Sequence, residues 1–146
     1  MTSLPRATGE RIHVFVNGPS DVDWARRTAR EMGVREGLNE IRAVALATAV
    51  SEIARNILVH AGKGQISFCP VTDGQRRGIV VVARDEGPGI ADIEQAMQDG
   101  YSTKGSLGLG LSGARRMVDA FEIESVAGAG VTITLTKWRE DDRLDD

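Results

Sequence analysis

Cysteine is almost missing from this chain of 146 residues, which contains only Cys69. An intrachain disulfide is therefore excluded, and a reducing compartment is the natural setting. A secretory signal is also missing, because no apolar run follows basic residues at the N-terminus. The longest apolar stretch, residues 43–50, is far too short to span a bilayer. We therefore expect a cytoplasmic protein that does not enter a membrane.

An excess of positive charge is lacking as well, since the formal net charge is −3. Without a basic field, nucleic acid is not an expected partner. The composition, 41% hydrophobic and 27% charged, is that of an ordinary globular protein. A chain of this length buries roughly two thirds of its unfolded surface in one domain, without a metal or a disulfide. We place that domain at residues 10–139, between a flexible arm at 1–9 and an acidic, disordered tail at 140–146.

Hydrophobic periodicity predicts strands and helices along the whole domain. Residues 12–16 alternate as a first strand, and Ser20 is the expected N-cap of a helix that reaches about Gly33. A second, very apolar helix is predicted for residues 38–61. The remaining expected elements are strands at 65–71 and 78–83, a helix at 91–98, a mobile lid at 100–107, a glycine turn and helix at 108–120, and strands at 121–126 and 131–138.

The apolar helix carries a polar stripe, in which Glu52, Asn56 and His60 share one face. The stripe is either the solvated edge of a buried helix or a functional site. Asn56 fits the first interpretation poorly, because asparagine is a mediocre helix former. His13 is also a candidate base, but a single histidine in a strand is more often structural.

Two glycine clusters follow, at residues 85–89 (Asp-Glu-Gly-Pro-Gly) and 108–113 (Gly-Leu-Gly-Leu-Ser-Gly). Glycine allows a positive φ and lets a backbone approach a ligand closely. The helix expected after the second cluster would also direct its N-terminal amides toward an anion. Asp85 comes after a continuously apolar stretch, so it lies at the end of a central strand. The pattern predicts a nucleotide held by the main chain.

The signatures of two common phosphate-binding sites are absent. A P-loop requires Gly-x-x-x-x-Gly-Lys-Ser/Thr, and no lysine of the chain stands in that context. Residues 108–113 match Gly-x-Gly-x-x-Gly, but a dinucleotide site requires a strand that runs into the first glycine, and residues 101–105 are not strand-like. The expected carboxylate about twenty residues later is also missing, because Glu122 and Glu124 come too early. A P-loop is excluded, and a Rossmann site is disfavoured.

Three motifs together resemble the GHKL superfamily of ATPases and kinases, which has the Bergerat (HATPase) fold. Residues 52–56 are similar to its N box, residues 85–89 to its first glycine box and residues 108–111 to its second. Each motif alone is weak, whereas their order and spacing together are specific. The resemblance implies an α+β fold, a two-layer sandwich of a mixed, mostly antiparallel sheet with helices on one face.

Within that superfamily, residues 49–56, 61–66 and 100–103 are similar to the RsbT-type switch kinases of bacterial stress signalling. The similarity runs from about residue 10 to Trp138. It implies a small serine/threonine kinase that uses ATP and Mg²⁺, phosphorylates STAS-domain partners and, once released, binds a PP2C-type phosphatase. The chain would then belong to a stressosome-like partner-switching module.

The chemistry of three residues agrees with this resemblance. Asp85 accepts hydrogen bonds, so it suits the exocyclic amino group of adenine but would face an oxygen in guanine. Asn56 offers a neutral oxygen to a Mg²⁺ ion that takes its negative ligands from phosphates. Glu52, one turn earlier, is the expected general base toward a partner's hydroxyl.

The resemblance assigns further nucleotide contacts to the two glycine boxes and to the lid. The superfamily also has a threonine directly after the glycine that opens the last strand. Here Gly130 is followed by Val131, and Thr132 comes next, where strand alternation would turn it to the other face. The additional cofactor-binding candidates are Gly87, Gly89, Thr103, Lys104, Gly105, Gly108, Gly110 and Thr132.

Two alternative functions share this ATP site. A sensor histidine kinase would need an upstream dimerisation hairpin with a phosphoacceptor histidine, for which 146 residues leave no room. A nucleotide-gated binding module, such as an anti-sigma factor or phosphatase activator with little kinase activity, has no motif that excludes it.

Overall fold

The computed structural model describes residues 5–98 and 110–139. Strands and helices alternate in these two segments much as the periodicity predicts. In chain order the elements are β1 (Arg6–Ala7), β2 (Ile12–Val16), α1 (Pro19–Arg35), α2 (Glu40–His60), β3 (Gly64–Thr72), β4 (Arg77–Asp85), α3 (Ile93–Ala96), α4 (Gly110–Arg116), β5 (Ala120–Val126) and β6 (Gly130–Trp138).

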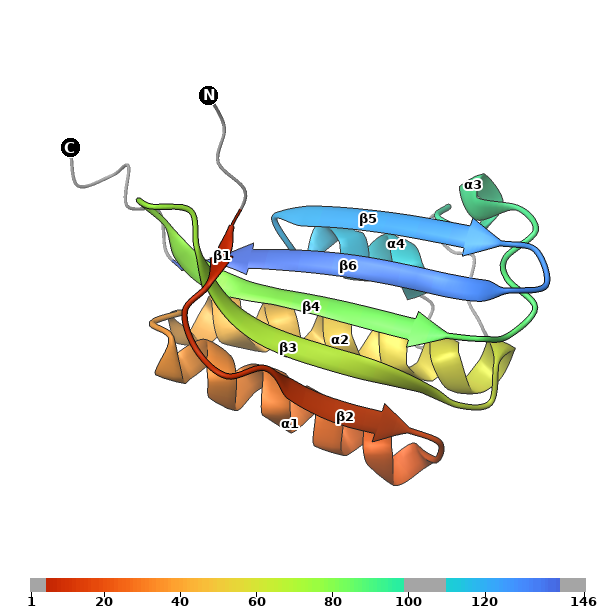
Figure 1. Cartoon of the computed structure of the whole chain (residues 1–146), viewed down its shortest axis with the longest axis horizontal. Helices are drawn as coiled ribbons and strands as arrows, with labels where there is room; N and C mark the ends of the chain where they lie inside the picture. The colour runs from red at the N-terminus through yellow and green to blue at the C-terminus, as the bar shows by residue number, and fades with distance from the viewer. Residues whose placement is uncertain (1–4, 99–109, 140–146) are drawn as a thin grey trace.

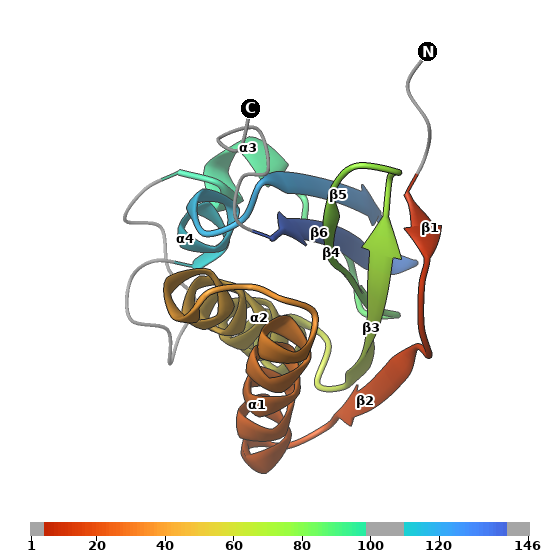
Figure 2. The same ribbon diagram turned by 90° about the vertical axis from the view of Figure 1, so that its left-hand side faces the viewer.

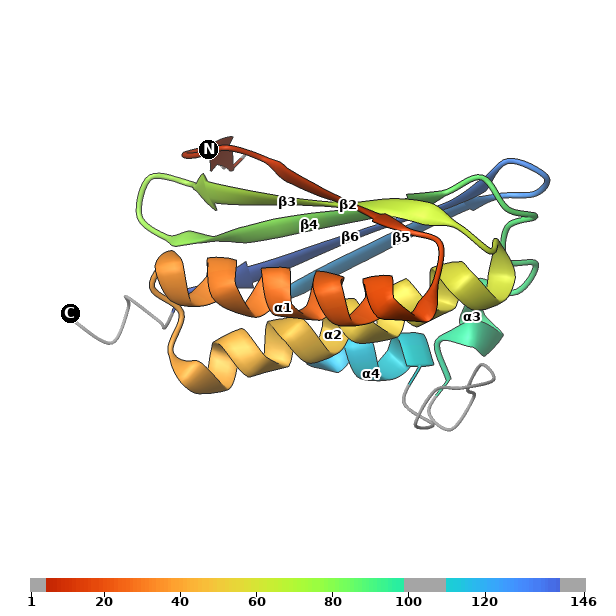
Figure 3. The ribbon, with the colours of Figure 1, turned by 90° about the horizontal axis from the view of Figure 1, so that it is seen from below.

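The strands form one sheet in the order β1-β3-β4-β6-β5, and β2 pairs with β3 beside β1 (Figure 1). Each pairing in the described part of the chain is antiparallel. The helices α1, α2 and α4 cover one face of the sheet (Figure 2). Seen from below, α2 lies between α1 and α4 (Figure 3). This arrangement confirms the predicted α+β sandwich with its helices on one face.

The core lies between α2 and the sheet, as the alternation of β4 and β6 requires. Inward-facing positions of both strands are buried, and the positions between them are exposed or half-buried on the outer face. The apolar residues of α2 complete this core. Its inward-facing members on the two strands are Ile79, Val81, Ala83, Val131, Ile133 and Leu135.

By length and composition, α2 is the one helix in the described residues that is long and apolar enough to cross a membrane. However, 61% of its most apolar 18-residue window is buried inside the fold, against α1, α4 and the sheet. A helix that is apolar over most of its circumference belongs in a protein core or a bilayer, and here the protein core surrounds it.

Several predicted boundaries differ from the structure. The N-cap of α1 is Gly18 and Pro19 is the first helical residue, so the assignment of Ser20 as N-cap is wrong. The helix α3 is one turn with Asp92 as its N-cap, much shorter than residues 91–98. The last predicted helix ends at Arg116 rather than 120, because Asp119 already bonds to Thr136 of β6 through its N–H.

The N-terminal region also contains structure. Arg6 and Ala7, which fall in the expected flexible arm, pair with Thr72 and Val71 of β3. The N–H of Thr8 donates to the carbonyl oxygen of Pro70 at 2.8 Å and extends this attachment. The predicted lid at 100–107 and the predicted tail at 140–146 lie outside the described residues.

Candidate functional site

Asp85 is the last residue of β4, on the inner face of the sheet, and is 9% exposed. Its Oδ1 accepts the N–H of Gly87 at 2.9 Å, which fixes the carboxylate at the start of the loop. The neighbouring strands approach too closely for any side chain at Gly130, where a Cβ would lie 2.0 Å from the Asp85 carbonyl oxygen. Gly130 also has a φ of 111°. The backbone beside Asp85 therefore requires glycine at position 130.

The first glycine box, which begins at the end of β4, packs between the end of α2 and the end of β5. A Cβ on Gly87 would lie 2.6 Å from that of Ala61, just past α2, and Gly89 has a φ of 85° beside the Val126 carbonyl. These glycines are therefore required by packing. The Ser125 hydroxyl ties the same loop to β5, since it accepts the Ile90 N–H at 2.7 Å and donates to the Ile90 carbonyl at 3.2 Å.

Sequence reasoning missed Ser125, although β5 contained a signal. The inward positions of this strand are Phe121, Ile123 and Ser125, so a hydroxyl interrupts an apolar face. A polar residue at such a position needs a hydrogen-bond partner, which Ile90 supplies.

Two of the three residues of the polar stripe of α2 are buried, since Glu52 is 5% exposed and Asn56 is 4% exposed, whereas His60 is half-buried. The Glu52 Oε1 accepts a hydrogen bond from the Arg55 Nη1 at 3.0 Å. No side-chain hydrogen bond is formed by Asn56 within residues 5–98 and 110–139, yet no side-chain polar atom there is fully buried without a partner, so the Asn56 amide remains accessible from the cavity it lines. An amide that faces a cavity and is not used by the fold can bind a ligand there.

A cavity of about 200 Å³ opens beside Asn56. It lies between α2, the first glycine box, α3 and the start of α4. Glu52 precedes the lining residue Asn56 by one turn of α2, and Asp85 precedes the lining residue Gly89 by four positions, but neither of them lines the cavity in the described residues. The lining residues are Asn56, His60, Gly89, Ile90, Ala91, Asp92, Gln95, Ala96, Gly110 and Leu111.

The structure thus brings Asn56, Gly89 and Gly110 of the predicted site to one cavity, together with His60 of the polar stripe, which was not among the cofactor-binding candidates. The candidates Thr103, Lys104, Gly105 and Gly108 lie outside the described residues.

Thr132 does not reach this site, which corrects its assignment as a cofactor-binding residue. Asp85 pairs with Val131 in the β4–β6 ladder, whereas Thr132 pairs with Arg84. Because side chains alternate along a strand, Thr132 faces the outer side of the sheet, away from the helices and the cavity. The turn before β6 does not shift this register.

The model of the histidine kinase-like ATPase domain matches residues 15–137 of the chain. The chain belongs to this family. Within the histidine kinase-like ATPases, it is 44% identical over 118 residues to the serine/threonine-protein kinase RsbT of Bacillus subtilis, a match that covers 81% of this chain and 89% of RsbT. It is also 33% identical over 102 residues to an anti-sigma F factor of a Thermoanaerobacter species, covering 66% of this chain and 70% of that protein.

A solved structure gives the same assignment of fold. The RsbU and RsbW domains of a Mycobacterium tuberculosis protein match 92% of this chain and 34% of that one, with a TM-score of 0.63 at 19% identity. These comparisons confirm the predicted GHKL superfamily, the Bergerat fold and the RsbT-type branch. This histidine kinase-like ATPase is therefore a serine/threonine-protein kinase of the partner-switching type. The comparisons do not favour the alternative of a binding module with little kinase activity.

Proposed function

We propose that this kinase transfers the γ-phosphoryl group of ATP to a serine or threonine of a STAS-domain protein and, once released, binds a PP2C-type phosphatase. It would do so in the cytoplasm, in a stressosome-like module. The 44% identity to RsbT supports the choice of reaction. The observation that carries the site is Asn56, a 4% exposed residue whose amide lines a cavity between the two glycine boxes and forms no side-chain hydrogen bond within the described residues.

Asp85 would hold the adenine. One of its oxygens accepts the Gly87 N–H, and a carboxylate has acceptor capacity beyond one such bond. The exocyclic amino group of adenine supplies a donor, whereas guanine places a carbonyl oxygen there. Since an unpaired buried polar group can discriminate by about 10⁴-fold, ATP should be strongly preferred over GTP.

Asn56 would hold the metal, and the second glycine box would hold the phosphates. A neutral amide oxygen fits a Mg²⁺ ion that keeps several waters and takes its negative ligands from phosphates. Gly110 begins α4 at the cavity wall, where backbone N–H groups can face an anion. Contacts from Gly87, Thr103, Lys104, Gly105 and Gly108 remain predictions.

Glu52 would accept the proton of the attacking hydroxyl. ATP supplies the phosphoryl group, and Mg²⁺ neutralises charge on the phosphates. Glu52 lies one helical turn before Asn56, so the base and the metal ligand share one rigid helix. Rigid placement of this kind is the main protein contribution to phosphoryl transfer.

Radiolabelled ATP with a STAS-domain acceptor tests this function. We expect label on the acceptor with the wild-type kinase and a transfer rate about 10²- to 10⁴-fold lower in Glu52→Gln, while Glu52→Gln retains ATP binding. Gln is the matched variant because it preserves the size of the side chain and removes its basicity. A tight kinase–acceptor complex without label transfer would contradict the proposal and favour a nucleotide-gated binding module.

A further inference from the structure

Arg55 lies one helical turn after Glu52 on α2 and forms an ion pair with it, with 3.0 Å between Arg55 Nη1 and Glu52 Oε1. The two side chains differ in exposure. That of Glu52 is 4% exposed, whereas that of Arg55 is 35% exposed. The pair therefore connects a buried carboxylate to a cation at the protein surface.

The exposed side of Arg55 lines a groove of about 460 Å³ between α1 and α2, together with Val22, Arg26, Ser51 and Leu58. The nucleotide cavity lies on another side of α2, where Asn56 and His60 line it. Successive helical residues are turned by about 100°, so Glu52 is about 60° around the helix from Arg55 and about 40° from Asn56. Glu52 thus lies between the groove and the cavity.

This position matters because the attacking and leaving oxygens of a phosphoryl transfer are roughly in line. With the nucleotide in the cavity, the acceptor hydroxyl arrives from a side of α2 away from the leaving group. A base that serves this hydroxyl has to be held between the two sides. Glutamate has three rotatable side-chain bonds, and a misplacement of about 1 Å can lower a rate by about 10²-fold.

Arg55 meets this requirement in two ways. A buried carboxylate is stabilised by a hydrogen-bonded opposite charge, and the guanidinium supplies one. The contact also restricts the direction of the carboxylate, since guanidinium donors have a fixed geometry.

On the basis of the proposed function, we infer that Arg55 is a positioning residue for phosphoryl transfer. Its guanidinium holds the Glu52 carboxylate between the groove and the nucleotide cavity, in line with the incoming hydroxyl. Arg55 acts through Glu52 and is not itself a catalytic residue.

Three variants of the full chain test this role in single-turnover phosphoryl transfer, at saturating ATP and acceptor. Arg55→Met removes the charge and keeps the length, and we expect it to lower the transfer rate by about 10- to 100-fold. Arg55→Lys should recover part of the rate, because it restores the charge without the fork of donors. Arg26→Met is the matched control, since Arg26 lines the same groove but pairs with Asp23, and it should transfer at the wild-type rate.

Affinity for a fluorescent ATP analogue is measured in parallel and should stay within about twofold of wild type in all three variants. The decisive comparison repeats Arg55→Met in the Glu52→Gln background. If Arg55 acts through Glu52, the second substitution lowers the residual rate no further. Equal losses in both backgrounds, a wild-type rate in Arg55→Met, or a parallel loss of analogue binding would each overturn the inference.

The wild-type and Glu52→Gln arms separate this inference from the proposed function. If the wild-type kinase transfers phosphate and Glu52→Gln transfers it at least about 10²-fold more slowly, the proposed function stands and Arg55 alone is at issue. If the wild-type kinase transfers none to the STAS-domain acceptor, the proposed function fails and the role of Arg55 fails with it.

Discussion

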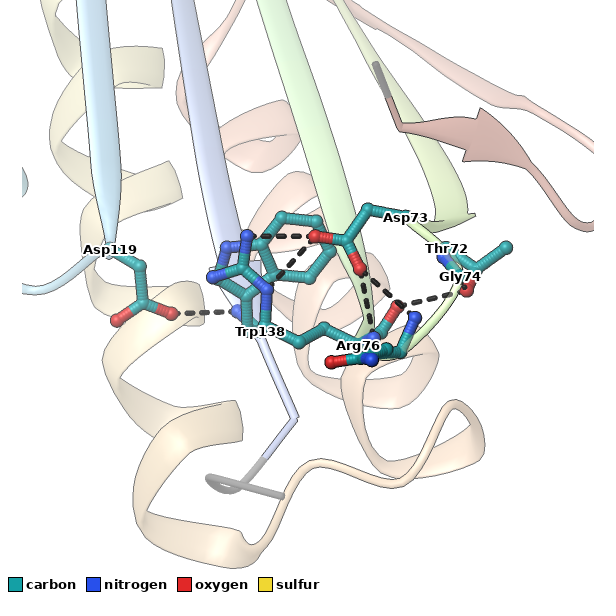
Figure 4. Close-up of polar contacts among 7 residues, drawn as sticks. Thr72, Asp73, Gly74, Arg76, Asp119 and Trp138 are labelled. Atoms are coloured by element: carbon teal, nitrogen blue, oxygen red, sulfur yellow. Dashed lines mark hydrogen bonds and ion pairs between the residues drawn. The ribbon is translucent and has the colours of Figure 1, made fainter. Parts of the chain in front are cut away.

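The strands β4 and β6 run side by side from the candidate site to the opposite end of the sheet. The polar side chains at the two ends differ in how far other protein groups satisfy their hydrogen bonds. At the opposite end, Asp73 accepts hydrogen bonds from the Arg76 side chain at 3.0 and 2.8 Å (Figure 4). The Arg76 guanidinium lies 4.1 Å from the centroid of a Trp138 ring. Asp119 accepts the Trp138 N–H at 2.7 Å. Protein groups satisfy one another there.

At the site end, Asp85 accepts the Gly87 N–H, while Asn56 faces a cavity without a partner in the described residues. The strand register is the same antiparallel ladder at both ends. An amide at a cavity wall that the fold does not use keeps its hydrogen-bonding capacity for a ligand. The comparison separates polar groups that stabilise the fold from polar groups that we propose bind the nucleotide.

The largest expected effect comes from Asp85→Asn at the site end. The amide oxygen can still accept the Gly87 N–H, so the domain should remain folded. The new NH₂ group would meet the amino group of adenine, where two donors face each other. We expect ATP binding to fall below detection by calorimetry, with an unchanged circular dichroism spectrum. Retained micromolar affinity would refute the adenine assignment.

Asn56→Ala should have the next largest effect, on turnover more than on nucleotide binding. It removes the proposed metal ligand from α2 and leaves Asp85 in place. We expect Mg²⁺-dependent transfer to fall by more than about tenfold, with a higher Mg²⁺ requirement. A Mg²⁺ titration of the transfer rate measures this. Unchanged turnover would move the metal role to another residue.

Ser125→Ala tests the comparison at a residue of the site end that does not line the cavity. Ser125 holds the loop of the first glycine box through Ile90. The substitution removes both hydrogen bonds to Ile90, and each bond contributes about 1 kcal/mol. We therefore expect ATP affinity to weaken by at most about 30-fold, with little change in the transfer rate at saturating ATP. Ser67→Ala is the control, since Ser67 lies on the outer face and should leave ATP affinity unchanged. Equal ATP affinity in the two variants would exclude the loop-holding role.

Much of the fold could be predicted from the sequence, because local patterns determine it. The apolar positions of α2 and the alternation in β4 and β6 indicated the layers, and Asp85 was placed at a strand end. Glu52 and Asn56 came from their spacing and from a family resemblance. The segments that enclose Asn56 are the first glycine box, α3 and the start of α4, which no local pattern of α2 describes.

The features that could not be predicted depend on contacts between distant segments. Thr132 was assigned from a family position, but the pairing of Asp85 with Val131 decides which face it takes. Ser125 meets Ile90 from 35 residues away. Arg55 was not among the candidates from the sequence, because its groove exists only when α1 lies against α2. Such contacts arise from tertiary packing.

Asp73→Asn, at the opposite end, should have the smallest effect and should act on stability alone. Hydrogen bonds from the Arg76 backbone, and then from its side chain, hold the pKa of Asp73 below its ordinary value of 3.8. Because the pKa is lower in the folded state, the ionised carboxylate contributes stability above the ordinary pKa, and this contribution is lost as pH falls through the folded pKa. We expect Asp73→Asn to lower the free energy of unfolding by at most about 1 kcal/mol at neutral pH, in urea titrations. The difference from wild type should shrink toward acidic pH, and ATP affinity should not change. A variant that lost ATP affinity would show that the two ends of the sheet are coupled, contrary to the division argued above.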